Sequence, residues 1–452
     1  MIGTEIAVDE FRLSLELAAN NGRKFMSMFA HEIEADSQEK RSCCRLCSSP
    51  VTTTFVDLGM HPLCESFVKS DQIDAMEPFY PLHAQVCDSC FLVQLKEYVS
   101  PEHIFNEYAY FSSYSTSWVD HAKRYCEMIA ERLNLGPQSL VVELASNDGY
   151  LLQHFDPLGV PVLGIEPAAN VAKIAKDKGV PTRVDFFGVR LAKELVSEGI
   201  SADVIAGNNV LAQVPDLNDF VAGMKILLKP EGVVTLEFPH LLTLIDENQY
   251  DTIYHEHFSY FSFTTINEMA KRHGLKLIDV EEIPTHGGSL RVYLAHEGSA
   301  RPVSASVQEL LEREEGIGIR SSELYQSFSE QVCRSKRSLL SFLIEAKEAG
   351  KTICGYGAPG KGNTLLNYCG IGPDFLDFTV DRNPYKHGRF TPGTHIPILP
   401  VEAIDEAKPD YILILPWNLK DEIVNQMRHV GSWGAKFIVP IPKVSIIDPK
   451  EL

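Results

Sequence analysis

The chain has 452 residues, of which 44% are hydrophobic, and its formal net charge is −20. This length suits two or three domains with ordinary buried cores. An acidic surface without a basic stripe disfavours nucleic acid as a partner. No apolar run reaches the roughly 20 residues that a membrane span needs. Because neither a signal peptide nor a disulfide framework is evident, we expect a protein of the reducing cytoplasm. The sequence indicates no oligomeric state.

The first structured segment is predicted to bind zinc. Residues 1–41 read as an extension, helical or partly disordered, and residues 42–100 form a cysteine-rich domain with two Cys-x-x-Cys pairs, Cys44 with Cys47 and Cys87 with Cys90. Four thiolates in two tight turns suit a structural zinc ion. The 39 residues between the pairs exceed the usual spacing of zinc ribbons. Buried, unpaired cysteines are the alternative.

Residues 101–304 are predicted to form an α/β domain with a parallel sheet. After an aromatic linker and a helix, apolar runs at 140–142, 160–165, 203–206 and 232–238 alternate with helical segments. This βαβ rhythm predicts helices on both faces of the sheet. Residues 305–348 read as amphipathic helices that connect to a second α/β domain at 349–452, with strands predicted at 352–354, 375–380, 411–415 and 436–440.

The strand ends of the first α/β domain predict a nucleoside site. Glu143 ends one strand and Glu166 ends the next, 23 residues later, where a carboxylate can accept both hydroxyls of a ribose. The intervening loop has one glycine, Gly149, so it lacks the cradle of a pyrophosphate. S-adenosylmethionine, which has no phosphate, fits better. S-adenosylmethionine is a methyl donor, and the residues predicted to bind this donor are Glu143, Ser146, Asn147, Gly149, Glu166 and Asn209. An ordinary turn with solvated acids is the alternative.

Tyr254 to Phe261 gathers base, acid and phenol in eight residues. His257 is a candidate general base for a proton next to a carbonyl, Tyr254 a donor to the enolate oxygen, and Glu256 a group that orients its neighbours. A second metal site and a plain aromatic core segment are the alternatives. His286, before two glycines, marks a tight turn near a ligand or merely a hairpin.

Gly355 to Gly360 follows a strand and matches the spacing of a dinucleotide loop. Lys361 and the helix N-terminus also suit a diphosphate, and nearby basic residues favour a substrate that carries phosphate. A nicotinamide cofactor or a simple glycine-rich turn are the alternatives. The predicted substrate-binding residues are Gln213, His286, Tyr356, Lys361, Asn363, Arg382, Asn383, Lys386 and Asn418.

Together these segments resemble the sugar C-methyltransferases of deoxysugar biosynthesis over residues 43 to about 445. The markers are the cysteine pairs, Tyr108–Ser115, Ser146–Tyr150, Gly164–Pro167, Asn208–Ala212, Tyr254–Phe261 and Gly355–Asn363. The resemblance implies a zinc-binding lobe, a class I methyltransferase domain and a C-terminal Rossmann-like domain that holds a nucleotide-linked sugar.

The resemblance also implies S-adenosylmethionine-dependent methylation at carbon 3 of a nucleotide-linked 4-keto-6-deoxysugar. It makes His257 the base, places Tyr254 and Glu256 beside the sugar, and assigns Tyr108 to a segment that helps to close the site. Gln213 departs from the histidine of the family and Ala145 from a glycine. A nicotinamide-dependent oxidoreductase and a non-catalytic zinc-stabilised scaffold are the competing interpretations.

Overall fold

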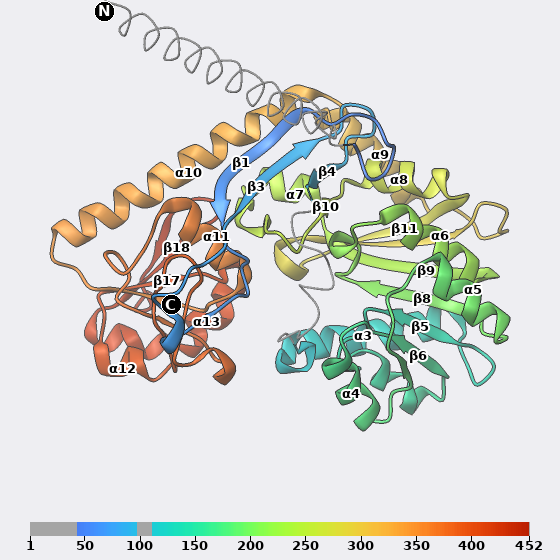
Figure 1. Cartoon of the computed structure of the whole chain (residues 1–452), viewed down its shortest axis with the longest axis horizontal. Coiled ribbons are helices and arrows are strands. Elements are labelled where there is room, and N and C mark those ends of the chain that lie inside the picture. The colour runs from blue at the N-terminus through green and yellow to red at the C-terminus, as the bar shows by residue number, and fades with distance from the viewer. Residues whose placement is uncertain (1–42, 97–110, 452) are drawn as a thin grey trace, which may run out of the picture. The chain divides into compact units, whose positions relative to one another are not determined.

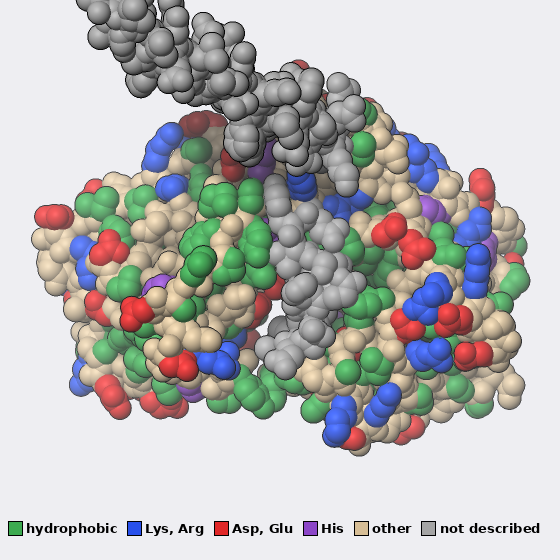
Figure 2. Space-filling view, viewed as in Figure 1, with side chains coloured by type: hydrophobic (Ala, Val, Ile, Leu, Met, Phe, Trp, Pro, Cys, Tyr) green, Lys and Arg blue, Asp and Glu red, His purple; other side chains and the backbone are tan. Residues whose placement is uncertain are grey.

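The computed structural model describes residues 43–96 and 111–451, and the chain from Cys44 onward forms one compact unit. The predicted extension over 1–41 and Tyr108 lie outside the described residues. Among the described helices, none has the length and apolar character required to cross a bilayer. Figure 2 shows Lys and Arg side chains interspersed with Asp and Glu over the described surface of the face in view.

The cysteine-rich segment contributes three strands to an antiparallel sheet with the order β1-β3-β4-β10. The strands are β1 (Thr53–His61), β3 (Tyr80–Val86), β4 (Val93–Leu95) and β10 (Ser259–Tyr260). The fourth strand belongs to the Tyr254–Phe261 motif, and Ser259 pairs with Gln94. The candidate catalytic motif is therefore attached by backbone hydrogen bonds to the sheet of the cysteine-rich segment.

The central sheet has the described order β11-β12-β9-β8-β5-β6-β7 (Figure 1). Its strands are β5 (Val141–Leu144), β6 (Val162–Ile165), β7 (Thr182–Arg183), β8 (Ala202–Asn208), β9 (Leu228–Pro239), β11 (Leu275–Ile283) and β12 (Ser289–His296). The strands from β7 to β9 are parallel, and β12 pairs antiparallel with both its neighbours. Val141 and Val142 lie in different buried clusters, so both faces of the sheet are covered.

Helices cover this sheet and lead to the next domain. Those of the central domain are α3 (Thr116–Leu133), α4 (Ala169–Asp177), α5 (Val189–Ser197), α6 (Leu217–Leu227), α7 (Leu241–Asp246) and α8 (Phe263–Arg272). The predicted connector consists of two helices, α9 (Ala305–Ile317) and α10 (Ser322–Glu348). Ser115 caps α3 by accepting from Trp118 N, and Ser262 caps α8 by accepting from Thr265 N.

The C-terminal sheet has the described order β16-β14-β13-β17-β18-β19. Its strands are β13 (Ile353–Tyr356), β14 (Thr379–Val380), β16 (Ile398–Leu399), β17 (Tyr411–Ile414), β18 (Lys436–Val439) and β19 (Ser445–Ile447), with helices α11 (Gly360–Cys369), α12 (Ala403–Ala407) and α13 (Lys420–Gln426). The strand predicted over 375–380 is shorter than expected, because Phe375 and Leu376 donate to Gly372 O in a turn. The predicted α/β fold class is confirmed.

One hydrophobic core joins the cysteine-rich sheet, α10 and the C-terminal sheet. Phe55 of β1 stacks on Phe328 of α10 with ring centroids 4.5 Å apart. A short ribbon adds a second link, because β2 (Val68–Lys69) pairs with β15 (Arg389–Phe390). The cysteine-rich segment therefore contacts both α/β domains.

Candidate functional site

The four predicted zinc ligands come together. The Sγ atoms of Cys44, Cys47, Cys87 and Cys90 all lie within 4.8 Å of one another. Both pairs adopt the same turn: the amide of Ser48 donates to Cys44 O, and that of Phe91 donates to Cys87 O. Ser48 and Phe91 have φ of 62° and 59°, which turns each chain back after its second cysteine. Four thiolates so placed fit a closed tetrahedral zinc site.

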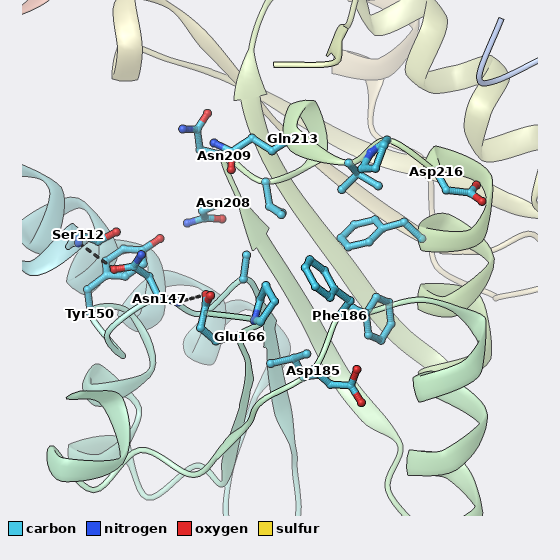
Figure 3. Close-up of a pocket in the computed structure, with 18 of the residues that line it drawn as sticks. Ser112, Asn147, Tyr150, Glu166, Asp185, Phe186, Asn208, Asn209, Gln213 and Asp216 are labelled. Carbon is cyan, nitrogen blue, oxygen red and sulfur yellow. Dashed lines mark hydrogen bonds between the residues drawn. The ribbon is translucent and has the colours of Figure 1, made fainter. Parts of the chain in front are cut away.

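A pocket of about 280 Å³ opens at the carboxyl ends of the central strands. Ends of parallel strands are where α/β folds bind ligands. Three predicted donor-binding residues, Asn147, Glu166 and Asn209, line it, as do the predicted substrate residues Gln213 and His286. Figure 3 shows Asn147 beside Glu166, with Asn208 and Asn209 at the end of β8 and Gln213 in the short turn that follows that strand.

Glu166 is held in place by the backbone on either side of it. Its Oε2 accepts from Asn147 N at 2.9 Å and its Oε1 accepts from Ala168 N at 2.8 Å. Each carboxylate oxygen has a second acceptor site that remains available to a hydroxyl. Burial raises the pKa of Glu166, whereas the two backbone amides lower it.

The chemistry of the pocket fits S-adenosylmethionine. Among the described residues, both amide atoms of Asn208 and Oδ1 of Asn209 are buried without a hydrogen-bond partner. Unpartnered buried polar groups are costly, so a polar ligand is expected there. On the side away from these amides, aromatic side chains suited to a flat base line the wall, and Figure 3 labels Phe186 among them. Glu166 would hold the ribose, and the asparagines would hold the amino-acid portion.

Three of the predicted donor-binding residues do not line this pocket. Glu143 is 1% exposed, and burial, together with the charges of Glu166 and Asp148, raises its pKa well above the ordinary value. Ser146 is fully buried against Gly164. Gly149 has φ of +76°, and a Cβ there would lie 3.0 Å from Val180. The lack of a side chain at Gly149 therefore suits both the positive φ of the turn and the close packing against Val180.

The sequence interpretation missed the apolar wall of the pocket. Its members include Trp118, Phe186, Phe187, Val214 and Phe220. Phe186 and Phe187 follow β7, which has only two residues, so no apolar run marked the strand that positions them. Trp118 comes from α3 and stacks on His121 with ring centroids 5.1 Å apart.

The predicted base, His257, is buried and has one ring nitrogen without a partner among the described residues. Its side chain is 4% exposed, and its Nδ1 lies 3.1 Å from Thr252 O. A carbonyl only accepts, so Nδ1 carries the proton and Nε2 carries the lone pair. Nε2 is buried and has no partner among the described residues. Burial lowers the pKa of His257 to about 4, with Lys361 contributing in the same direction.

The neighbours of His257 have different environments. The ring of Tyr254 lies against that of His257, with centroids 4.0 Å apart. His255 points elsewhere, with Nε2 3.2 Å from Pro81 O. Glu256 accepts from the thiol of Cys64 at 3.7 Å. Burial raises the pKa of Glu256 to about 8, so its carboxyl group is protonated at neutral pH.

A second cavity, of about 740 Å³, lies at the strand ends of the C-terminal domain. Four predicted substrate residues, Tyr356, Arg382, Asn383 and Lys386, line it, and Arg389 adds a further positive charge. Lys386 Nζ donates to Ala358 O at 2.8 Å and lies 3.8 Å from Glu65 Oε2. The cavity therefore combines the glycine-rich loop with basic side chains.

Three other predicted substrate residues are not among those lining this cavity. Asn363 donates to Cys64 O at 2.6 Å, and Lys361 donates to Asn418 Oδ1 at 2.9 Å. The start of α11, where the sequence suggested a diphosphate, holds the carboxylate of Glu65, which accepts from the Gly360 amide. A Cβ on Gly360 would lie 3.3 Å from Glu65 Oε1. Phosphate is therefore expected at the basic side chains instead.

Three protein-family models match successive parts of the chain. Residues 44–105 match a model described as "Putative zinc binding domain", residues 118–280 match a methyltransferase domain, and residues 284–442 match a C-methyltransferase C-terminal domain. The C-methyltransferase NovU of Streptomyces niveus is 34% identical over 405 residues, covering 90% of this chain and 96% of NovU.

More distant similarities cover less. A ubiquinone biosynthesis O-methyltransferase of Bartonella tribocorum is 26% identical over 116 residues, which are 24% of this chain and 47% of that protein. The solved structure of PH0226 protein from Pyrococcus horikoshii has a TM-score of 0.34 and 15% identity, covering 43% of this chain and 97% of PH0226. Because the match to NovU spans both chains, the protein belongs to the family of S-adenosylmethionine-dependent C-methyltransferases that carry a zinc-binding domain.

Proposed function

We propose that the substrate is a nucleotide-linked 4-keto-6-deoxysugar and that the methyl group is added at carbon 3. The observation that carries this proposal is the position of His257 in the chain of contacts between the two cavities. Burial lowers its pKa and the charge of Lys361 contributes in the same direction; the same charge acts on His286, which lines the pocket expected to bind S-adenosylmethionine. The preceding Glu256 contacts Cys64, whose neighbour Glu65 lines the second cavity.

The proposed chemistry begins with proton removal. The carbonyl at carbon 4 acidifies the hydrogen on carbon 3, and Nε2 of His257 accepts that proton. The resulting enolate has a nucleophilic carbon, while S-adenosylmethionine, when bound, supplies an electrophilic methyl group. Tyr254, in ring contact with His257, would position the sugar or its oxygen. The chain supplies the remainder of the rate by holding the two reactants in one geometry.

The second cavity supports the nucleotide part of the proposal. Its volume of about 740 Å³ suits a nucleoside diphosphate. Arg382, Lys386 and Arg389 are the cations that a diphosphate could engage, although Glu65, Asp381 and Glu422 line the same cavity and a diphosphate would compete with them. Glu65 at the start of α11 opposes the alternative, since a dinucleotide pyrophosphate would meet a carboxylate there. The nicotinamide-dependent oxidoreductase is therefore the weaker candidate.

Gln213 bears on which sugar is used. It lines the donor pocket, where the family has histidine, and at neutral pH its amide cannot act as a base. It can donate to or accept from a hydroxyl or amino group of the sugar. We infer that Gln213 selects among substituents and does not take part in proton transfer, which leaves His257 as the base.

The test is a screen of purified full-length protein against a panel of nucleotide-linked 4-keto-6-deoxysugars with methyl-labelled S-adenosylmethionine. We expect label on carbon 3 of at least one member, read by mass spectrometry and NMR. A matched panel of 4-hydroxy sugars should give no label, because they lack the acidifying carbonyl. Label on oxygen or nitrogen, or reduction of the ketone with added nicotinamide cofactor, would overturn the proposal.

A further inference from the structure

Lys361 has an unusual environment for a lysine in a glycine-rich loop. Its ammonium donates to Asn418 Oδ1 at 2.9 Å and lies 4.8 Å from the ring centroid of Trp417. It is not among the residues lining the basic cavity of the C-terminal domain. The side chain therefore turns from α11 toward the loop that follows β17, which carries Trp417 and Asn418.

Lys361 lies over the ring of Trp417 and is stabilised by the charge of Asp251. The indole Nε1 of Trp417 donates to Asp251 Oδ2 at 2.7 Å, and Asp251 is 0% exposed. Burial raises the pKa of Asp251 to about 6, so the carboxylate is charged at neutral pH. Burial lowers the pKa of Lys361, whereas the charge of Asp251 raises it. The carboxylate thus favours the ammonium form of a desolvated lysine.

Trp417 and Asp251 are also adjacent to residues that position His286 and His257. The edge of the Trp417 ring packs on Gly287, where a Cβ would lie 2.6 Å from it, and Gly287 follows His286. Thr252, next to Asp251, provides the carbonyl that orients His257. His257 and His286 each have an unpartnered, buried Nε2 within the described chain. Burial lowers the pKa of both imidazoles and the charge of Lys361 contributes in the same direction, so the ammonium and the two imidazoles form one electrostatic cluster next to Trp417.

We propose that Lys361 is a catalytic residue whose ammonium binds the carbonyl oxygen of the sugar and stabilises the negative charge that develops there. This inference rests on the proposed function. It assigns Lys361 to the reacting centre and leaves the diphosphate to Arg382, Lys386 and Arg389.

The charge balance of the step is complete. The proton on carbon 3 moves to Nε2 of His257, and the electron pair of the broken C–H bond forms the double bond between carbons 3 and 4. The carbonyl electron pair moves onto the oxygen at carbon 4. That oxygen becomes an anion while the imidazole becomes a cation, so a fixed ammonium at the oxygen favours the products of the step. Fixed charges in a water-poor site are effective because they need no reorganisation.

The first experiment tests the placement without any substrate. The charged and titratable groups that face His257 are Lys361, His286, Tyr254 and Tyr260. Histidine-selective NMR should follow the His257 ring in the wild type, K361M and K361R. We expect its pKa to rise in K361M and to stay low in K361R. An unchanged pKa in K361M would overturn the proposal.

The second experiment tests the role. The probe is the panel member that accepts a methyl group, and the measurement is exchange of its carbon-3 hydrogen in deuterated water without donor. We expect K361M to lose at least 100-fold in exchange rate at saturating sugar, with the KM changing less than tenfold, and K361R to recover part of the rate. A raised KM with normal exchange at saturation would show a binding role only and would overturn the proposal.

Lys336 provides a matched control, because its Nζ also lies over an aromatic ring, 4.5 Å from the centroid of Tyr368. K336M should exchange at the wild-type rate and leave the pKa of His257 unchanged. The two proposals fail differently. If the wild type exchanges and methylates no keto sugar, the proposed function is wrong, and the substrate-free titration still decides whether Lys361 faces His257.

Discussion

Arg45 Nη1 donates to Pro215 O at 3.1 Å, which ties the zinc turn to the wall of the donor pocket. Arg45 stands between two of the zinc ligands, and Pro215 lines the pocket. The other nitrogen, Nη2, donates to Leu95 O at 2.5 Å, and the guanidinium lies 5.4 Å from the ring centroid of Phe258, the residue after His257. One side chain therefore contacts the sheet of the cysteine-rich segment, the pocket at the carboxyl ends of the central strands and the Tyr254–Phe261 segment.

We expect R45M to weaken S-adenosylmethionine binding about fivefold to tenfold, although Arg45 is not among the residues lining the pocket. A charge-assisted hydrogen bond is worth about 1.5–3 kcal/mol, and each 1.4 kcal/mol is tenfold in affinity. R45K should be intermediate, because one ammonium cannot reach both carbonyls. Titration calorimetry measures the effect. R313M, which removes a surface ion pair with Glu282, is the control and should bind normally.

Zinc content gives the second prediction. The chain should hold one zinc ion, measured by elemental analysis of protein prepared without chelator. C47S should lose the zinc and lower the melting temperature by about 5 °C or more, because a structural metal contributes folding free energy. C333S, which changes a cysteine outside the cluster, should keep the zinc and the wild-type melting temperature. Donor affinity should fall with the zinc, since the turn that carries Arg45 loses its anchor. Full zinc content in C47S would contradict the ligand assignment.

The sequence predicted the parts of this site that depend on local patterns. Cysteine spacing indicated the zinc turns, and the apolar runs located strands such as β5 and β8. Residues such as Lys361 and Glu65 could not be placed. The direction of Lys361 depends on Asp251, more than 100 residues earlier in the chain, and the start of α11 is filled by a carboxylate from the cysteine-rich segment. Such contacts between domains leave no periodic signal in a single sequence.

Glu166 should contribute directly to donor affinity. E166A removes the carboxylate that would accept the ribose hydroxyls, so we expect the Kd for S-adenosylmethionine to rise at least about tenfold. The amides of Asn147 and Ala168 also lose their acceptor, so the melting temperature should be measured in parallel. E297A, on an exposed turn, is the control. Unchanged affinity in a folded E166A protein would place the donor elsewhere.

Glu256 gives a prediction about stability and pH. Burial raises its folded-state pKa from 4.5 to about 8. The unfolded chain therefore loses its proton first, and the folded state loses stability as the pH rises from about 4.5 to about 8. E256Q, which resembles the protonated acid, should escape this loss. The melting temperature of E256Q relative to the wild type should rise over that interval and level off above it. A constant difference would show that Glu256 is ionised in the folded protein.

The last prediction concerns the base. H257A should strongly reduce both carbon-3 hydrogen exchange and methylation, while the affinity for S-adenosylmethionine stays within about threefold, because His257 is not among the residues lining the pocket expected to bind it. General-base catalysis contributes about 10²- to 10⁴-fold, so a loss in this range is expected. H255A is a close control: it removes a buried histidine two positions away that contacts Pro81 O instead.

The titration of His257 tests whether its ring is neutral, and so able to accept a proton, at the pH of the reaction. With its pKa lowered to about 4 by burial and by Lys361, the ring is neutral at pH 7 and its Nε2 can accept a proton. Its NMR titration should therefore have a midpoint well below the ordinary value near 6.5. H257N can keep a hydrogen bond to Thr252 O but cannot accept the proton, so it should fold and bind donor without exchanging the sugar. Exchange at the normal rate in H257N would assign the base to another residue.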